Sequence, residues 1–513
     1  MNKDSRTAKS IKNSSVALAF YFVNLALQFF SRKIFLDYLG AEILGLNTTA
    51  TNLLQFLNLA ELGIGMAVGF SLYKPFYDKD TQAINEIVDL QRLLYRQIAY
   101  IVIAGAVVLM CFFPWIFVKM SLPLWYAYAS FGVLLFSAML SYFVNYKQIL
   151  LSADQKEYKI QYSYGVVMLV KVLVQIFVIR YFENKYFWWL ILEVLFAIIA
   201  SCALNYTIHR TFPFISSSKL SLKELNKKYP IIQKKVKQLF IHRISGFVLT
   251  QTSTIIIYAF SSLTIVALYG NYMLVTLGLT RLVEALSKGQ IASVGNLIAE
   301  GNDEKIMSVF EEVFSIRFFI AVVICYSMML LTQPFILLWI GEEYLLPTST
   351  LVFIIGILYI NLSRQAVDTY IYANGFYSDI YAPIIESILN ISLSILLGHF
   401  FGLNGILLGV LISLVIVILG WKPIFVFCIN FKYGYRQYLK SYLKHLLLAG
   451  IVIFFSYQLQ KQLLLETIES WNQFVLYGGI CIISFTALLM FILCLFKCGI
   501  RTTLKRLKQN NLF

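Results

Sequence analysis

Long apolar stretches separated by short polar turns run through almost the whole chain. A helix that crosses a bilayer needs about 20 mostly apolar residues, and the 513 residues contain fourteen windows of roughly this length. The pattern predicts an all-α integral membrane protein with about fourteen transmembrane helices. The windows are residues 14–36, 43–73, 97–118, 124–151, 162–182, 186–209, 237–260, 263–287, 316–340, 348–373, 383–402, 404–429, 443–461 and 471–497.

The composition agrees with this pattern. The chain is 59% hydrophobic and 13% charged, whereas an ordinary soluble protein carries about 25% charged residues. The first window follows a basic tail, but it is too long for a signal-peptide core, and no small-residue cleavage site follows it. We therefore expect the first window to remain as a membrane anchor.

The distribution of Lys and Arg predicts the orientation. With the N-terminus inside, and with basic residues near the end of a window assigned to the adjoining loop, 31 of the 42 basic residues fall in the tails and even-numbered loops, four fall in the outer loops and seven stay within windows. Because basic residues are retained on the cytoplasmic side, both termini are expected there. The net charge of +16 then needs no nucleic-acid partner, since the charges are spread over separate loops. The densest basic run, residues 219–237, is expected to lie along anionic headgroups.

The chain shows no motif for covalent, metal or nucleotide chemistry. All seven cysteines lie in or beside apolar windows, where they are expected to pack rather than pair. There is no paired-cysteine zinc spacing, no Gly-x-Ser-x-Gly and no Walker loop. We therefore expect no catalytic residues, no metal and no cofactor, and a transporter rather than an enzyme.

The basic stretch 210–236 divides the first twelve windows into two sets of six, which gives the sets parallel orientation. A faint repeat supports this division, because a shift of 226 residues places Gln55 on Arg281 and Asn58 on Glu284. The prediction is a cytoplasmic tail, a six-helix lobe, a basic cytoplasmic linker, a second lobe, a loop with two appended helices, and a second tail. These parts are residues 1–13, 14–209, 210–236, 237–429, 430–497 and 498–513.

Several phrases resemble a known family. They are "GAEILGLNTTATNLLQFLNLAELGIGMAVGFSLYKPFYDKD", "LLSADQKEYKI", "YGNYMLV", "SVGNLIAEGNDEKI" and "PFILLWIGEEYLLP". In order and spacing they resemble the polysaccharide flippases of bacterial O-antigen and capsule synthesis, which belong to the multidrug, oligosaccharidyl-lipid and polysaccharide exporter superfamily. The resemblance covers most of residues 14–440 and is weaker in the last two helices.

The resemblance implies a flippase of the bacterial cytoplasmic membrane. Such a protein moves undecaprenyl-diphosphate-linked oligosaccharide repeat units from the cytoplasmic to the outer leaflet by alternating access, for surface polysaccharide synthesis. Its partners would be this lipid-linked oligosaccharide, membrane lipids and other polysaccharide-assembly proteins, and the chain would act as a monomer. The alternatives are a cation-coupled drug exporter of the same superfamily and a membrane polysaccharide polymerase or ligase. The last is disfavoured because the longest external link has about nine residues.

Window 43–73 carries a polar face. At 100° per residue its polar positions lie within an arc of about 140°. This face either lines a wet cavity or makes hydrogen bonds to neighbouring helices. Asn52 and Gln55 are the candidate substrate contacts on it. The polar residues are Asn47, Thr48, Thr51, Asn52, Gln55 and Asn58.

Glu61 is an acid within the same apolar window. Gly65 and Gly69 follow it and permit a close helix approach. An intramembrane acid is a functional candidate by default, so Glu61 is predicted to carry a proton or sodium ion or to form a gate ion pair. The alternative is a structural acid satisfied by an Arg or by backbone. Asp368 is the second candidate for ion coupling.

Basic residues within the windows are candidates for holding the diphosphate. Lys171 lies at a depth similar to that of Glu193 on the next window, which predicts an ion pair that either serves the substrate or locks the hairpin. Arg281, Glu284 and Lys288 follow i, i+3, i+7 spacing and so have self-pairing as an alternative role.

The remaining basic residues have structural alternatives too. Arg364 and Asp368 follow i, i+4 spacing, which permits self-pairing. Arg243 and Arg32 lie near window ends, where long side chains can snorkel to the headgroups. Lys422 beside Trp421 is interpreted as an interfacial anchor.

The windows contain seven basic residues and five acidic ones, of which Glu386 is the fifth. This surplus suits a diphosphate, which Arg grips through paired hydrogen bonds. The predicted substrate-binding residues are Arg32, Lys171, Arg243, Arg281, Arg364, Asn52 and Gln55. The predicted ion-coupling or gating residues are Glu61, Glu193, Glu284 and Asp368, with H⁺ or Na⁺ as the coupling ion.

Overall fold

The computed structural model describes residues 6–61, 64–218, 220–287, 294, 297–298, 301–374, 379, 381–432, 434–463 and 468–509. Side chains 6–11, 59–60, 237–251, 285–287, 372, 461–463, 504–505 and 507–509 fall outside the description. The described residues are almost entirely helical and contain no strand. The predicted all-α fold class is confirmed.

The chain divides into two compact units, residues 1–267 and 268–513. The division falls within α12, whereas the sequence places the border between its two lobes at the linker 210–236. The first unit holds α1 (Arg6–Leu57), η1 (Asn58–Glu61), α2 (Ile64–Asp78), α3 (Thr81–Cys111), α4 (Phe113–Ile116), α5 (Trp125–Phe143), η2 (Asn145–Gln148), α6 (Ile149–Ala153), α7 (Glu157–Ile160), η3 (Gln161–Gly165), α8 (Val166–Tyr181), α9 (Lys185–Thr211), α10 (Leu222–Lys228) and α11 (Pro230–Phe260).

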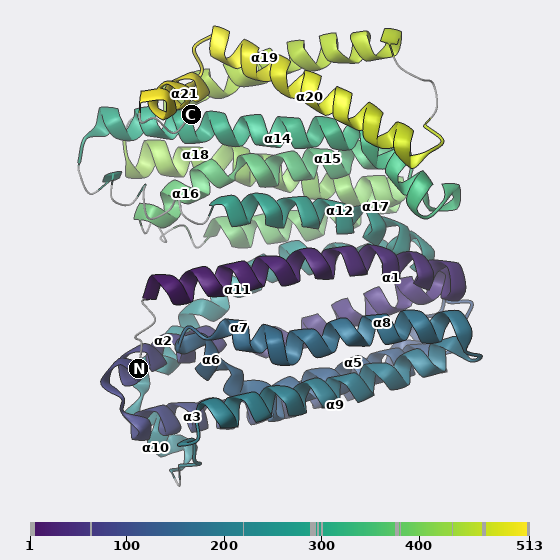
Figure 1. The fold of residues 1–513 in the computed structure, drawn as a ribbon, viewed down its shortest axis with the longest axis vertical. Coiled ribbons are helices and arrows are strands. Elements are labelled where there is room, and N and C mark those ends of the chain that lie inside the picture. Colours follow the sequence, from purple (N-terminus) through teal and green to yellow (C-terminus); the bar gives the residue numbers. More distant parts are fainter. Residues whose placement is uncertain are drawn as a thin grey trace. The chain divides into compact units, whose positions relative to one another are not determined.

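The second unit contains most of α12 (Leu263–Ser287) and the helices that follow it (Figure 1). Within it α14 packs against α15, α20 and α21, and α19 packs against α20. The helices are α14 (Asp303–Trp339), η4 (Glu342–Tyr344), α15 (Thr348–Ser363), α16 (Gln365–Asn374), α17 (Tyr381–Leu414), η5 (Val415–Trp421), α18 (Lys422–Ile424), η6 (Phe425–Asn430), α19 (Tyr435–Leu463), α20 (Trp471–Leu495) and α21 (Gly499–Gln509).

Among the described residues, eleven helical stretches are long and apolar enough to cross a membrane. Two of them, Lys12–Leu57 and Tyr381–Asn430, each merge two predicted windows across a kink. The kinks lie at Gly40 (φ 83°) and Gly402 (φ 57°), where a residue without a Cβ adopts positive φ at little cost. When both stretches are divided at their kinks and α11 is taken for window 237–260, every one of the fourteen windows coincides with helical structure.

The second window is not one continuous helix, and this corrects the sequence interpretation. The helix ends at Leu57, a 3₁₀ turn runs from Asn58 to Glu61, and the helix resumes at Ile64. The Asn58 carboxamide accepts a hydrogen bond from Tyr142, and the Glu61 carboxylate accepts one from Tyr95. Hydrogen bonds from distant tyrosines thus hold Asn58 and Glu61 in a turn where hydropathy alone predicts a continuous helix. Glu61 lies in this break, at the end of a turn.

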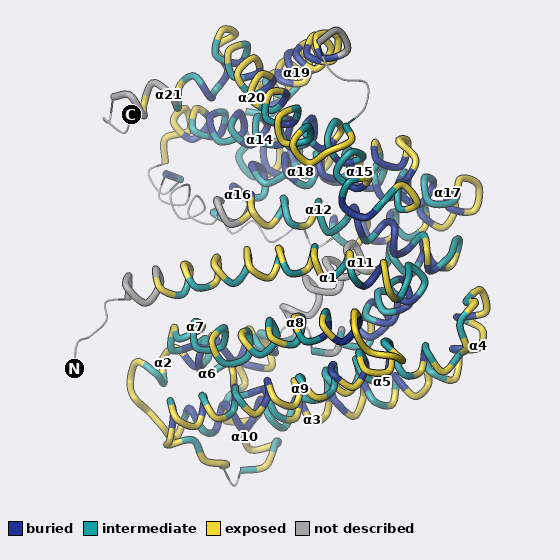
Figure 2. Tube along the Cα trace, turned by 45° about the vertical axis from the view of Figure 1, so that its right-hand side comes forward, coloured by how far each residue is buried: buried dark blue, intermediate teal, exposed yellow. Residues whose placement is uncertain are grey.

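Each unit has its own apolar core. In the first unit it includes Val68 of α2 and Leu90 of α3, both fully buried. In the second unit the aromatic rings of Phe310, Phe314 and Phe318 on α14 form its centre. Figure 2 shows buried residues on the inward sides of the helices and exposed ones on their outer sides. The exposed side chains include many large apolar ones, as expected for helices that face lipid.

The basic linker docks on the first unit. Ser221 caps α10 in a capping box with Glu224, and the hydrogen bonds from Ser221 lower the pKa of this carboxyl group. The Lys228 ammonium lies 2.7 Å from the Glu86 carboxylate, and the Tyr229 hydroxyl donates to it at 2.6 Å. This part of the predicted headgroup-binding run therefore makes protein contacts.

Candidate functional site

The polar face of the second half of α1 is tied into the first unit. The side-chain amide oxygen Oδ1 of Asn47 accepts hydrogen bonds from the Ser130 hydroxyl at 2.6 Å and from the Tyr186 hydroxyl at 2.9 Å. Asn52 is buried and donates to the Thr48 carbonyl at 2.8 Å, whereas Gln55 is half-buried. Much of this face therefore makes hydrogen bonds within its own helix or to α5 and α9, and Gln55 keeps the more accessible position.

The Glu61 carboxylate meets tyrosines. The Tyr95 hydroxyl donates to Glu61 Oε1 at 2.8 Å, and the rings of Tyr95 and Tyr142 meet edge to face with centroids 5.6 Å apart. Within the described part of the chain, no Arg or Lys forms an ion pair with Glu61. Among the described residues, the structure therefore does not show the Arg partner that the sequence suggests as an alternative for Glu61. Because a phenol can donate to the ionised acid, the group is satisfied without being neutralised.

The predicted pair between Lys171 and Glu193 is present. The Lys171 ammonium lies 2.8 Å from Glu193 Oε2, and Gln175 donates to Glu193 Oε1 at 2.9 Å. The π-helical segment η3 precedes α8, on which Lys171 lies, and such segments are frequent at functional sites. The Glu193 carboxylate links α9 to α8 through Lys171 and Gln175. This geometry fits a pair that locks the helical hairpin and also a pair that serves the substrate.

A second charged cluster lies in the other unit. Asp368 accepts hydrogen bonds from Arg364 Nε at 2.8 Å and from the Lys422 ammonium at 3.0 Å. All three side chains are less than a quarter exposed. Lys422 is interpreted from sequence as an interfacial anchor, but in the structure it is an ion-pair partner of Asp368, which lies 54 positions earlier in the chain. The π-helical segment η5 directly precedes Lys422. The bond from Arg364 Nε to Asp368 is the i, i+4 pair that the sequence spacing permits.

Glu386 adds a second carboxylate to this cluster. It is 2% exposed, lies within electrostatic reach of Arg364 and Lys422, and leaves Oε1 without a hydrogen-bond partner in the described structure. One turn along α17, both polar atoms of the Asn390 amide are also buried and unpaired among the described residues. Buried polar groups normally have partners, so this position suits a proton, a water or a cation. The sequence does contain a signal for this cluster, because three successive windows each carry a charged residue, namely Asp368, Glu386 and Lys422.

The other candidates are more scattered. Arg32 is half-buried and donates to the backbone carbonyl of Ala267 at 3.2 Å, which is a protein contact rather than the expected headgroup contact. Arg281 and Glu284 are exposed on α12, and the described residues show no ion pair between them. The side chain of Arg243 and all of Lys288 lie outside the described residues.

Neither cluster is a metal centre of the usual kind. Within the described ranges no group of three or more His, Cys, Asp or Glu side chains is placed to hold a metal ion.

Comparisons of sequence give no relatives. No protein-family profile matches the chain, and no curated protein matches it. The comparison of folds finds solved structures with a similar fold. A multidrug resistance MATE family transporter of the MOP superfamily, in an inward-facing conformation, matches with a TM-score of 0.58 and 14% identity over 80% of this chain and 97% of its own.

The lipid II flippase MurJ, in an inward closed conformation, matches with a TM-score of 0.62 and 14% identity, covering 92% of this chain and 97% of its own. At this identity the likeness is one of fold. Together with the apolar helices, it shows that this chain is a multi-pass membrane protein with the fold of the MATE and MurJ transporters.

Proposed function

We propose that this protein is a flippase that moves a polyprenyl-diphosphate-linked oligosaccharide from the inner to the outer leaflet of the bacterial cytoplasmic membrane. The observation that carries the proposal is the match to the lipid II flippase, which covers 92% of this chain. That protein is a lipid II flippase, and the family phrases in this sequence point to a flippase as well. The surface polysaccharide repeat unit is the specific substrate that we infer.

The charged residues support an anionic headgroup. Moving phosphate and sugar out of water is the costly step, whereas the polyprenyl chain stays in lipid. Arg281 is exposed on α12 and, among the described residues, has no ion pair, so its guanidinium is available for a phosphate. Arg364 already uses its Nε–H on Asp368, so a phosphate would share this guanidinium with the carboxylate.

A drug exporter is the second candidate. The match to the MATE multidrug transporter has a TM-score of 0.58, and its likeness in fold favours this function as well. The buried, unpaired Glu386 oxygen is compatible with proton or sodium coupling in either transporter.

Reconstitution tests the proposal. The purified chain in liposomes should expose a fluorescent undecaprenyl-diphosphate oligosaccharide to an impermeant sugar-oxidising reagent on the opposite leaflet. Arg281→Ala should slow this exposure at unchanged abundance, and Arg281→Lys should retain more of it because the charge remains. Lys223→Ala is the matched control, since Lys223 is an exposed cation on α10.

The same liposomes distinguish the alternatives. Transport of a cationic dye driven by a proton or sodium gradient, without movement of the lipid-linked sugar, would favour the drug exporter and overturn the flippase proposal. Equal rates for Arg281→Ala and the control would remove Arg281 from the site.

A further inference from the structure

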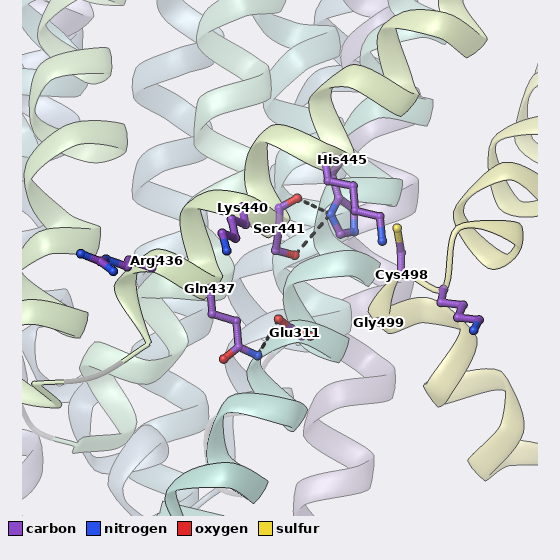
Figure 3. A pocket seen from close by; sticks show the side chains of 10 residues that line it. Glu311, Arg436, Gln437, Lys440, Ser441, His445, Cys498 and Gly499 are labelled. Atoms are coloured by element: carbon purple, nitrogen blue, oxygen red, sulfur yellow. Dashed lines mark hydrogen bonds between the residues drawn. The ribbon is translucent and has the colours of Figure 1, made fainter.

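The second unit encloses a cavity at one end of its helices. The cavity has a volume of about 460 Å³ and lies between the first half of α14, the start of α19 and the turn from α20 to α21. Figure 3 shows its lining, with Gln437 turned toward Glu311 and with Arg436 extended away from this pair. This volume is within the range of small-ligand sites.

Cations dominate the lining. Arg436, Lys440 and Lys444 recur every four residues along α19, which places them on one helix face, and Lys497 comes from the turn before α21. Glu311 is the acid among the lining residues, and one of its oxygens accepts a hydrogen bond from Gln437 at 2.8 Å.

The cations are not neutralised nearby. Within the described part of the chain, the four form no ion pair, and Lys444 donates to the Phe496 carbonyl at 2.6 Å. The cavity therefore has an excess of positive charge.

The walls of the cavity are fixed by the surrounding fold. His445 is 1% exposed, and its two ring nitrogens lie 2.7 Å from the Ser441 carbonyl and 2.9 Å from the Ser315 hydroxyl. Gly499 lies against the backbone of Glu311, where a Cβ would overlap the carbonyl group. The α21 helix is held by Arg506, whose guanidinium lies 3.1 Å from the Glu312 carboxylate. The helices that carry the basic residues are thus held in place by these contacts.

The surroundings indicate a ligand with a polar head and apolar chains. Exposed leucines continue along α19 beside the cavity, with Leu443 at 56% and Leu447 at 64% exposure, and Leu495 on α20 is 58% exposed. A second cavity, of about 580 Å³, shares Glu311 and Gln437 and is lined by Asp303 and Glu304. Its acids repel an anion, which confines a phosphate to the lysine side.

We propose that this cavity binds the headgroup of an anionic phospholipid, with the phosphate near Lys440 and Lys497 and the acyl chains along the exposed leucines of α19. Basic pockets between membrane helices are suited to such headgroups. The site shares no residue with the charged clusters described above and does not depend on the proposed transport function.

Native mass spectrometry of the full chain in detergent tests this proposal. The probes are dioleoyl phosphatidylglycerol and the zwitterionic dioleoyl phosphatidylcholine. The double variant Lys440→Gln and Lys497→Gln should lose about 25-fold in phosphatidylglycerol affinity, at roughly fivefold for each lysine. The charge-retaining Lys440→Arg and Lys497→Arg variant should keep most of it. The matched control is Lys223→Gln with Lys227→Gln, two exposed lysines of α10.

Several outcomes would overturn the proposal. One is an equal loss of lipid in the cavity and control variants, which would mean attraction by net charge alone. Another is a lysine-dependent binding of inorganic phosphate or pyrophosphate without binding of the lipid, which would make the site one for a free anion. A third is unchanged lipid binding with lysine-dependent retention of an acidic protein. Monodisperse elution of every variant establishes that it is folded.

Discussion

At the scale of single residues, the partner of a buried charge decides what that residue is able to do. Glu61 accepts a hydrogen bond from the uncharged Tyr95 hydroxyl, and no Arg or Lys among the described residues pairs with it. Asp368, by contrast, pairs with two cations, Arg364 and Lys422. A neutral substitution at Asp368 therefore leaves two cations without a counter-charge, whereas one at Glu61 does not.

Glu61→Gln should abolish the response of transport to a proton or sodium gradient while leaving abundance unchanged. The amide can still accept the hydrogen bond from Tyr95, but it cannot titrate. Tyr95→Phe is the control, since it removes the hydrogen bond and keeps the acid. The measurement is transport in liposomes with and without an imposed gradient, and an unchanged gradient response in Glu61→Gln would exclude this role.

Asp368→Asn should lower the melting temperature markedly in detergent. The change leaves the partly buried Arg364 and Lys422 without a counter-charge, and breaking such a pair costs about 3–5 kcal/mol. Lys422→Gln should cost less, because Arg364 continues to neutralise Asp368. Thermal unfolding followed by intrinsic fluorescence measures both effects, and the reverse order of stability would contradict the assigned pairing.

At the scale of elements, glycines set how closely helix segments approach. The chain reverses at Gly402, and the segments of α17 on either side of it then pack backbone to backbone. A Cβ at Gly409 would lie 2.5 Å from the Ser394 backbone nitrogen, and one at Gly405 would overlap the Leu397 carbonyl. Local sequence shows the glycines, but only the fold shows which of them meets a neighbour.

Gly409→Ala should therefore destabilise the protein, because overpacking typically costs about 1–3 kcal/mol. Gly450→Ala is the matched control, since no atom lies within 4 Å of its added Cβ, and there the better helix propensity of Ala should be neutral or stabilising. Abundance in membranes and the melting temperature give the readout. Equal behaviour of the two variants would show that the helix segments separate easily.

At the scale of the whole molecule, the sequence predicts fourteen spans with both termini on the cytoplasmic side. In a background without the seven native cysteines, Cys at Ser221 and at Gln509 should resist an impermeant thiol reagent in intact cells, whereas Cys at Glu469 should react. The reason is the retention of basic loops inside. Labelling at position 221 from outside would contradict the topology, and labelling after permeabilisation confirms that each site is reactive.

The membrane potential should assist export of an anionic cargo. Each net negative charge that moves outward across the full field gains about 2.3 kcal/mol per 100 mV. Liposomes with a potassium diffusion potential, inside negative, should therefore translocate the lipid-diphosphate sugar faster than liposomes without one. A rate and a final distribution that are indifferent to potential would indicate that no net charge crosses the field, as when cations are exchanged for the cargo.

The sequence alone was sufficient to predict the all-α membrane fold and helical structure in each window, because hydropathy and helix length are local properties that the bilayer enforces. It also indicated the Lys171 and Glu193 pair, since two adjacent antiparallel windows fix the depth of each residue. The break at Asn58–Glu61, the tyrosine partner of Glu61 and the role of Lys422 required the tertiary structure. These features depend on contacts between residues 34 and 54 positions apart, and no local pattern specifies which distant side chain meets a buried charge.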